Sequence, residues 1–420
     1  MYLKNPPTEA WNLIRKLNEK PRALTRFLRK EDPRLLCIRD LGQYKERGLI
    51  QHIAFLLFDD HFEIAKAASH LIEDRLKGIT LEELIELDQS MRGRGEYNYS
   101  SISSKKPSDL KKFRRFENPI PFLGICSFFP NGYVREHAIR NLCNFKTGKE
   151  LRFFLLRLND WVPQVRIIAK TEVVSRINPQ HIGSFVDNFD LIERLYSWGR
   201  DKHDEVLHAI EETVALPGSR EHLLRGIKHE NRRVRKLCVR IAAQTDSLPL
   251  MTLYQMVSKD SDPMVRLQII INAKDGVDPN QLRELTDAFI RDSFVGIRRE
   301  ALLLSVECKL NNKKRLLNNA LSDRHGSMRE LARFYLKKDG VSTRDFLAYY
   351  QNLWESESPT IGVVLGLGEV GEEGDAVAIR PLLVHSRAEM RRAAWKAIAN
   401  IKPENLRAIA LEKLKQDTPS

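Results

Sequence analysis

The sequence contains a short pattern of apolar and charged residues that recurs roughly every 31 residues. An apolar residue marks each copy, and a small or apolar residue follows it four positions later. The marked residues are Ile64, Val134, Val165, Val206, Val234, Val265, Ile297, Met328, Ile361 and Met390. Apolar spacing of i, i+3, i+4 and i+7 within a copy is that of an amphipathic helix. A repeat of this length therefore predicts stacked helix pairs, because neither helix of a pair can bury its apolar face alone.

Polar residues take fixed places in most copies of the pattern. Five positions before the marked residue stand Asp59, Asp160, Asp201, His229, Asp260, Asp292, Asp323 and His385. One position after it stand Arg135, Arg166, Arg235, Arg266, Arg298, Arg329 and Arg391. With these residues the pattern resembles the HEAT family of helical repeats, including the HEAT-like class named after phycobilisome lyases, over residues 125–415 and less closely over 30–80.

The resemblance implies that the Asp lies in the turn between two helices and that the Arg opens the second helix. It also implies that Asp and Arg join neighbouring repeats in a hydrogen-bonded ladder, so these arginines are not counted as a binding surface. Ala65, Leu207 and Gly362 stand where Arg is expected, which leaves the register of those three units open.

We therefore predict an all-α fold, an α-solenoid (right-handed superhelix) of about ten HEAT-like helix-turn-helix repeats. The predicted parts are an N-terminal helical region over 1–91 with an early repeat, a basic Ser/Gly-rich insertion loop over 92–118, a repeat array over 119–415 and a disordered tail over 416–420. A chain of 420 residues is too long for one ordinary compact core, which agrees with an elongated array.

The cysteines and the apolar runs bear on location. The five cysteines include no CxxC pair, which favours reduced thiols in an intracellular, cytoplasmic protein over a zinc site or a disulfide framework. No apolar run approaches the ~20 residues of a membrane span. The N-terminal stretch MYLKNPPTEAW lacks the apolar region of a secretory signal, so no signal peptide is expected.

The net charge of +13 predicts an acidic partner, which could be nucleic acid, an anionic membrane surface or an acidic protein surface. The segment KKPSDLKKFRRF is the most basic stretch. Its cations are Lys105, Lys106, Lys111, Lys112, Arg114 and Arg115, interleaved with Phe113 and Phe116. Such a segment could bind phosphates and stack on bases. It could equally be a solvated loop anchored by its Phe residues, or a nuclear-localisation or membrane-surface signal.

A second set of cations lies on the second helices of the repeats. A period of 3.6 residues points offsets +2, +5, +6 and +9 from the marked residue away from the core. These offsets hold more basic than acidic residues, which predicts a basic concave surface. The candidate partner-binding residues among them are Arg140, Lys170, Lys236, Arg240, Arg299, Arg333, Lys337, Arg392 and Lys396.

Catalytic and cofactor motifs are weak. His203 and His208 miss the i, i+4 spacing of a HExxH zinc site, and neither GK[ST] nor GxSxG occurs. Trp161 beside Asp160 and Trp198 near Asp201 resemble the alkylpurine DNA glycosylases by residue type only, and no bilin-lyase motif can be matched. We therefore expect no catalytic residue, no metal and no cofactor.

One glycine-rich motif could contradict the expectation that the chain binds no cofactor. Gly366, Gly368 and Gly371 match GxGxxG after the apolar run IGVVL, as in a dinucleotide-binding turn. In repeat register, however, IGVVL falls inside a second helix. Gly371 then suits a left-handed helix cap, and the interior glycines predict a soft joint between repeats.

The resulting hypothesis is a non-enzymatic scaffold or adaptor that binds a partner protein with an acidic surface through an extended, basic concave surface. The alternative is DNA or RNA binding through the same groove and the 105–116 segment, with a glycosylase-like activity as a remote possibility.

Overall fold

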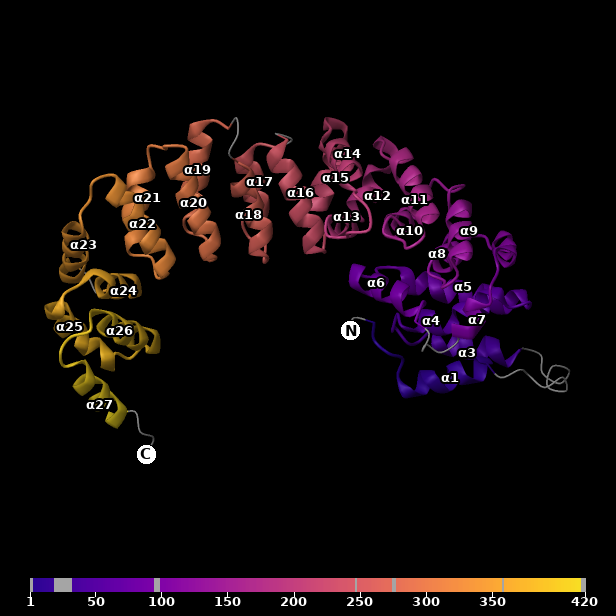
Figure 1. The fold of residues 1–420 in the computed structure, drawn as a ribbon, viewed down its shortest axis with the longest axis horizontal. Helices are drawn as coiled ribbons and strands as arrows, with labels where there is room; N and C mark the ends of the chain where they lie inside the picture. The colour runs from indigo at the N-terminus through magenta and orange to yellow at the C-terminus, as the bar shows by residue number, and fades with distance from the viewer. Residues whose placement is uncertain are drawn as a thin grey trace. The chain divides into compact units, whose positions relative to one another are not determined.

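The computed structural model describes residues 3–18, 32–93, 99–245, 248–273, 277–356 and 359–416, with side chains as far as Leu411 apart from that of Tyr99. All regular structure in these ranges is helical, and helices follow one another along the chain in antiparallel pairs (Figure 1). The predicted all-α solenoid is therefore confirmed. Residues 94–98 of the predicted insertion and 417–420 of the predicted tail lie outside the described residues.

The chain forms two compact units, Met1–Ile241 and Ala242–Ser420. The helices of the first unit are α1 (Thr8–Asn18), α3 (Pro33–Leu41), α4 (Leu49–Ile53), η1 (Ala54–Phe58), α5 (Phe62–Leu76), α6 (Leu81–Ser90), α7 (Tyr99–Ser103), η2 (Pro107–Arg115), α8 (Ile120–Cys126), α9 (Gly132–Leu142), α10 (Leu151–Arg157), α11 (Pro163–Ser175), η3 (Pro179–His181), α12 (Ile182–Val186), α13 (Phe189–Leu195), α14 (Asp204–Ala215), η4 (Pro217–Ser219), α15 (Arg220–Ile227) and α16 (Arg232–Gln244), of which residues 232–241 belong to this unit.

The helices of the second unit are α17 (Leu250–Val257), α18 (Pro263–Asn272), α19 (Pro279–Phe289), α20 (Val295–Glu307), α21 (Lys313–Leu321), α22 (Gly326–Lys338), α23 (Thr343–Ser356), α24 (Ile361–Val370), α25 (Glu373–Ile379), η5 (Arg380–Val384), α26 (Ala388–Ile401) and α27 (Leu406–Gln416).

The repeating pattern coincides with the second helices α5, α9, α11, α14, α16, α18, α20, α22, α24 and α26. Every marked apolar residue is buried except Ile361, which is half-buried. The residue four positions later, such as Ala138 on α9 or Ala332 on α22, is buried in every copy. The pattern therefore marks the core face, where apolar burial supplies the main stabilisation of each helix pair.

The predicted ladder of Asp and Arg joins successive repeats. Arg135 donates to both carboxylate oxygens of Asp160, at 3.0 and 2.9 Å. In the second unit Arg266 pairs in the same way with Asp292, and Arg298 with Asp323. The Asp also accepts a hydrogen bond from the backbone two residues on, as Asp292 does from Phe294 N at 2.8 Å. One carboxylate thus shapes its own turn and binds the preceding repeat, which confirms the structural interpretation of these arginines.

Each arginine of the repeat pattern also donates a hydrogen bond to the backbone. It donates to the backbone carbonyl six positions before it, as Arg135 does to Phe129 O at 3.0 Å and Arg298 to Asp292 O at 2.8 Å. The remaining donors are Arg166, Arg235, Arg266, Arg329 and Arg391. These bonds satisfy carbonyls that the preceding turn leaves without a helical partner.

Histidine replaces Asp where the preceding second helix has no Arg. Leu207 precedes the repeat of His229, and Gly362 precedes that of His385. In both turns the imidazole Nδ1 accepts from the backbone two residues on, at 2.9 Å from Asn231 N and 3.0 Å from Arg387 N. A neutral imidazole therefore preserves the turn at positions where the pattern supplies no cation that would need a carboxylate.

The ladder begins earlier than the sequence pattern indicates. Asp32 caps α3 by accepting from Arg34 N at 2.9 Å, and the Arg34 guanidinium reaches Asp59 at 2.7 Å. This pair spans 25 residues, as the rung between Arg135 and Asp160 does. The stretch DPRLL does not match the pattern, because Pro33 stands where the marked apolar residue would be.

The glycine motif lies in α24, a helix and not a strand, so the dinucleotide-turn alternative is wrong. An added Cβ would lie 1.8 Å from the backbone oxygen of Ser322 at Gly362, 2.2 Å from the Tyr350 ring at Gly366, and 2.3 Å from Ala397 Cα at Gly368. These glycines therefore allow close helix packing, which argues against a soft joint. The predicted left-handed cap at Gly371 is also wrong, because its φ is −75° and ψ 164°.

Candidate functional site

The basic segment 105–116 packs against η1 and the turn that follows it, within the first unit. Lys112 donates to Phe58 O at 2.8 Å and pairs with Asp60 at 2.7 Å. Arg115 donates to Leu57 O and Asp59 O, and Phe116 is buried. Lys105 lies over the Phe58 ring at 5.0 Å. These contacts support the interpretation of a segment anchored by its aromatic residues.

The described part of this predicted loop is itself helical, since it contains α7 and η2. Three of its cations, Lys106, Lys111 and Arg114, are exposed and form no ion pair within the described ranges. Their assignment to an anion-binding site stays a prediction.

Four of the predicted second-helix cations are neutralised within the chain. Arg140 pairs with Glu136 and Lys236 with Glu193. Arg240 pairs with Glu211, and Arg333 with Glu369. Reversing the charge of Arg240 or Arg333 would therefore disturb the fold as well as any binding surface.

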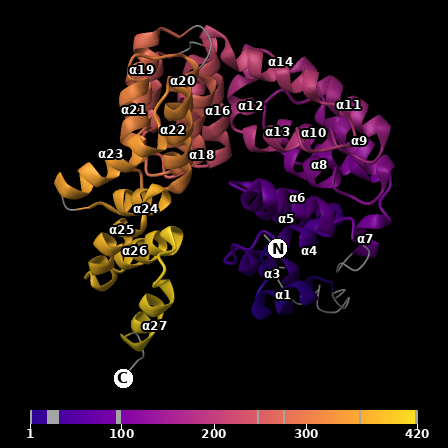
Figure 2. The same ribbon diagram turned by 60° about the vertical axis from the view of Figure 1, so that its left-hand side comes forward.

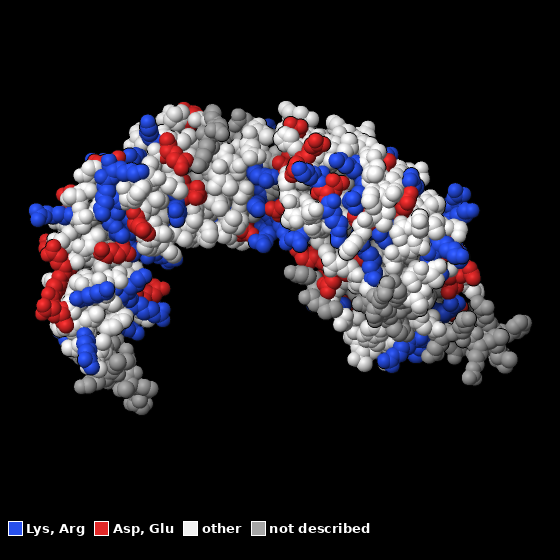
Figure 3. Space-filling view, viewed as in Figure 1, with Lys and Arg blue, Asp and Glu red and all other residues white. Residues whose placement is uncertain are grey.

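The other five predicted second-helix cations have no carboxylate partner among the residues that the structure describes. Lys170 is half-buried, whereas Arg299, Lys337, Arg392 and Lys396 are exposed. We call the last four the exposed cations of the second unit. They lie on α20, α22 and α26. Figure 3 shows Lys and Arg gathered over α22 and α26, and Asp and Glu gathered over α25.

An acidic helix lies against basic side chains in the first unit. Helix α6 has the sequence LEELIELDQS and runs alongside α10 and α13 in both ribbon views (Figures 1 and 2). Its Asp88 pairs with Arg157 of α10 at 2.5 Å, and its Glu82 pairs with Arg233 of α16. Arg194 of α13 lines the space between α6 and the repeats. We call Arg157, Arg194 and Arg233 the arginine row.

The sequence pattern did not reveal the arginine row. Arg157 and Arg194 lie on first helices, whereas the offsets used to choose candidates apply to second helices. The available signal was the acidic composition of α6 itself, whose Glu82, Glu83, Glu86 and Asp88 need cations when the helix packs against the array.

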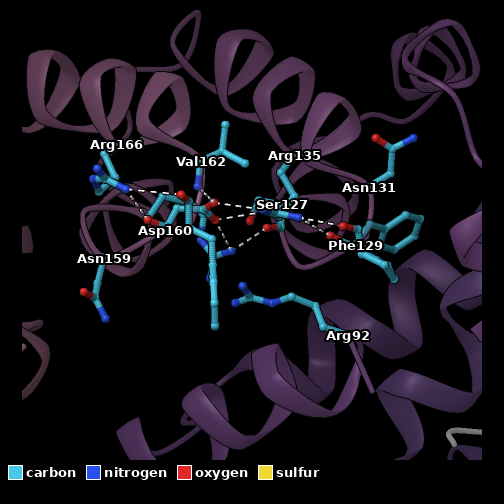
Figure 4. A network of polar contacts seen from close by, with 12 residues as sticks. Arg92, Ser127, Phe129, Asn131, Arg135, Asn159, Asp160, Val162 and Arg166 are labelled. Atoms are coloured by element: carbon cyan, nitrogen blue, oxygen red, sulfur yellow. Dashed lines mark hydrogen bonds and ion pairs between the residues drawn. The ribbon is translucent and has the colours of Figure 1, made fainter. Parts of the chain in front are cut away.

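A polar network joins the end of α6 to the ladder. Arg157 donates to Asp160 at 2.9 Å and to Ser127 O at 2.9 Å, and Arg92 pairs with Asp88. Figure 4 shows Asp160 with Arg135 on one side and Arg166 on the other. Asp160 therefore accepts from Arg135, Arg157 and the backbone of Val162. Burial would raise the pKa of Asp160, but the hydrogen bonds and charges of Arg135 and Arg157 hold this pKa below its usual value.

A cavity of about 520 Å³ opens beside this network. It is lined by Ile85, Asp88, Gln89, Arg92, Pro130, Arg135, Leu156, Arg157, Asn159, Trp161, Arg194, Trp198 and Arg200. We call it the arginine–tryptophan cavity. Trp161 and Trp198, which resemble glycosylase residues by type, both line this cavity, but the Asp160 carboxylate is already bonded to Arg135 in the ladder.

Histidine-based chemistry, metal binding and membrane insertion have less support in the described structure. His208 pairs with Glu212 at 3.2 Å, and His203 is buried at the start of α14. Within the described ranges no group of three His, Cys, Asp or Glu could hold a metal ion. In the same ranges no helix has the length and apolar character needed to cross a membrane.

Comparison with known proteins finds similarity at the level of structure. No protein-family model matches the sequence, and no curated protein does. An engineered protein of known crystal structure is 14% identical with a TM-score of 0.29, over 94% of this chain and 99% of that chain. Crystal structures of Kap121p are 12% identical, alone and as the karyopherin bound to the SUMO protease Ulp1p. Their TM-score is 0.31, over 98% of this chain and 50% and 51% of the Kap121p chains, respectively.

The chain thus spans about half the length of the Kap121p chains. Similarity at this level does not assign a function to the chain.

Proposed function

We propose that this chain is a non-enzymatic α-solenoid scaffold that binds an acidic segment of a partner protein through basic side chains of its repeats. The observation that supports this most is the packing of α6, an acidic helix held by arginines from separate repeats. Arg157 and Arg233 reach Asp88 and Glu82 of the same helix. The fold thereby offers cations at a spacing that one helix can contact.

The exposed cations of the second unit are the surface proposed for the partner. Arg299, Lys337, Arg392 and Lys396 project into solvent from α20, α22 and α26. A single exposed ion pair contributes only about 0.2–1 kcal/mol, so several must act together. Solenoid repeats suit this task because each repeat adds surface without changing the core.

Simultaneous charge reversal of these four residues to Glu is expected to weaken binding of an acidic helical peptide at least tenfold. Losing four pairs of about 0.2–1 kcal/mol and adding repulsion exceeds the 1.4 kcal/mol that corresponds to a factor of ten. Fluorescence anisotropy with a labelled peptide of the α6 sequence, on the full chain and over a range of salt concentrations, measures this effect.

The matched control is charge reversal of Lys314 and Arg344, two exposed cations on the first helices α21 and α23. The control is expected to keep most of the peptide affinity. Equal losses in the two variants, or no peptide binding at low salt, would contradict the proposed surface.

The nucleic-acid alternative is tested in the same assay with labelled duplex DNA and single-stranded RNA. Phosphate binding would give a log K that falls linearly with log[salt], with a slope set by the number of contacts. Tight nucleic-acid binding together with weak peptide binding would replace the protein-scaffold proposal by this alternative.

A further inference from the structure

The arginine–tryptophan cavity lies entirely within the first unit and is separate from the exposed cations of the second unit. Its walls come from the end of α6, the turn before α9, the end of α10 and the residues that follow α13. A volume of about 520 Å³ falls in the range of small-molecule sites. Because α6 closes one side, the cavity is suited to a small ligand.

Positive charge dominates this cavity. Five of its lining residues are arginines, namely Arg92, Arg135, Arg157, Arg194 and Arg200. Asp88 and the adjoining Asp160 are the carboxylates that pair with Arg92, Arg135 and Arg157. The cavity therefore carries an excess of about three positive charges.

Two of the arginines are left for a ligand. Arg194 is exposed and has no carboxylate partner among the described residues. Arg200 donates to a backbone oxygen, that of Asn159, at 3.0 Å. Neither guanidinium is needed to neutralise the Asp88 and Asp160 network, so both can pair with an added anion.

The buried wall also has unused hydrogen-bonding capacity. Within the described structure, Nε of Arg157 and Oδ1 of Asn159 are buried without a hydrogen-bond partner. Arg157 is only 1% exposed, so its N–H is fixed in direction by the ion pairs of the same side chain. Unpaired buried polar atoms are uncommon in folded proteins and call for an explanation.

Arg92 adds to the positive charge of the cavity. Burial lowers the pKa of Arg92, Asp88 opposes this shift, and the charges of Arg157 and Arg135 lower the pKa further. Guanidinium groups that repel one another are stabilised by a bound anion, and Arg binds phosphate bidentately.

The mouth of the cavity carries aromatic surface. Trp161 is 70% exposed although it is large and apolar. The guanidinium of Arg200 lies over its ring, with Cζ 4.2 Å from the ring centre. Trp161 follows Asp160, whose carboxylate fixes the backbone of this turn by accepting from Val162 N. An exposed indole next to cations can stack on a planar ring.

We propose that the arginine–tryptophan cavity is a binding site for a nucleotide, with the phosphates held by the arginines and the base stacked beside Trp161. Arg194 and Arg200 contact the phosphates, and the buried guanidinium of Arg157 adds positive charge behind the wall of the cavity. The ligand class follows from the combination of excess positive charge and an exposed aromatic ring in one cavity of this size.

Isothermal titration calorimetry on the full chain tests the proposal with ATP, GTP, pyrophosphate and adenosine as separate probes. We expect a nucleotide to bind at least tenfold more tightly than pyrophosphate, because the base adds a stacking contact. Adenosine is expected to bind weakest, because it lacks the phosphates. Equal binding of nucleotide and pyrophosphate would overturn the stacking part of the proposal.

Variants at the mouth of the cavity distinguish a nucleotide-binding site from a network that only stabilises the fold. Arg194→Gln together with Arg200→Gln is expected to lower nucleotide affinity at least tenfold with little change in melting temperature, because neither residue pairs with a carboxylate in the described structure. Trp161→Ala is expected to lower nucleotide affinity but to leave pyrophosphate affinity unchanged. Arg220→Gln, an exposed cation on α15 of the same unit, serves as the matched control.

Failure of both nucleotides to bind at millimolar concentration, or unchanged binding in the Arg194 and Arg200 variant, would overturn the site. Neither result bears on the acidic-peptide assay, which depends on residues of the second unit.

Discussion

Replacing Asp160 by Ala is expected to lower the free energy of unfolding by about 3–5 kcal/mol, the range for removing one partner of a buried ion pair. Asp160 is 1% exposed and pairs with Arg135 and Arg157, which are also buried. Removing the carboxylate leaves two buried guanidinium groups undercompensated and the Val162 amide without its acceptor. Urea denaturation of the full chain, followed by circular dichroism, measures the change.

Asp201→Ala is the matched control for this substitution. Asp201 holds the same place in the next copy of the pattern, but it is exposed and lies 4.0 Å from Arg166. Its removal is expected to cost less than about 1 kcal/mol, as for other solvent-exposed pairs. Similar losses for the two variants would show that burial of the Asp160 network does not contribute as described.

The Asp160 network also predicts a dependence of stability on pH. The pKa of Asp160 in the folded state lies below its unfolded value, which is about 3.9 for Asp. The stability that Asp160 contributes is therefore present above the unfolded pKa and is lost as the pH falls through the folded pKa. Asp160→Asn is expected to make the loss of stability as the pH falls below about 4 shallower than in the wild type.

The second large effect is expected from Gly368→Ala on α24, which should lower the free energy of unfolding by up to about 3 kcal/mol. The added Cβ would lie 2.3 Å from Cα and 2.5 Å from Cβ of Ala397 on α26. Both atoms belong to Ala397, which is fully buried, and they cannot move like the end of a flexible side chain. Because helix propensity alone would make the same change stabilising by about 1 kcal/mol, the sign of the measured effect decides between packing and propensity.

Gly374→Ala on α25 is the control for this change. An added Cβ at Gly374 meets nothing within 4 Å. Thermal or urea unfolding is expected to show an unchanged or slightly raised stability, by up to about 1 kcal/mol. A stabilising effect at Gly368 of the same size would contradict the close-packing role assigned to the α24 glycines.

Much of the fold could be predicted from the sequence because the repeat pattern reflects local chemistry. Val134 and Ala138 lie four positions apart, so a helix must place them on one face, and both are buried as expected. The rung between Arg135 and Asp160 was also predictable, since the same pair of positions recurs along the chain. Arg34 forms an equivalent rung but was not predictable from the pattern, because Pro33 replaces the apolar residue that precedes the other arginines.

The candidate site was far less predictable, because its residues come from segments that the sequence keeps apart. Asp88 and Arg157 form an ion pair across 69 positions, and Glu82 and Arg233 across 151 positions. No periodicity connects such residues. For the cations predicted from their helical positions, the neighbouring residues decide whether the charge is available. Arg240 is neutralised by Glu211, whereas Arg299 is exposed and has no carboxylate partner among the described residues.

By itself, the sequence determined the helix pairs, the core face of each second helix and the turns built on Asp, because these depend on residues within one or two repeats. Only the tertiary structure decided what the GLGEVG stretch does and where the arginines gather. A glycine inside a helix either weakens the helix or allows another element to pack closely against it. Here Tyr350 packs against Gly366 and Ala397 against Gly368, so these glycines allow close packing. An arginine likewise becomes structural or available for binding according to whether a carboxylate from a distant segment reaches it, because charge pairing acts through space and not along the chain.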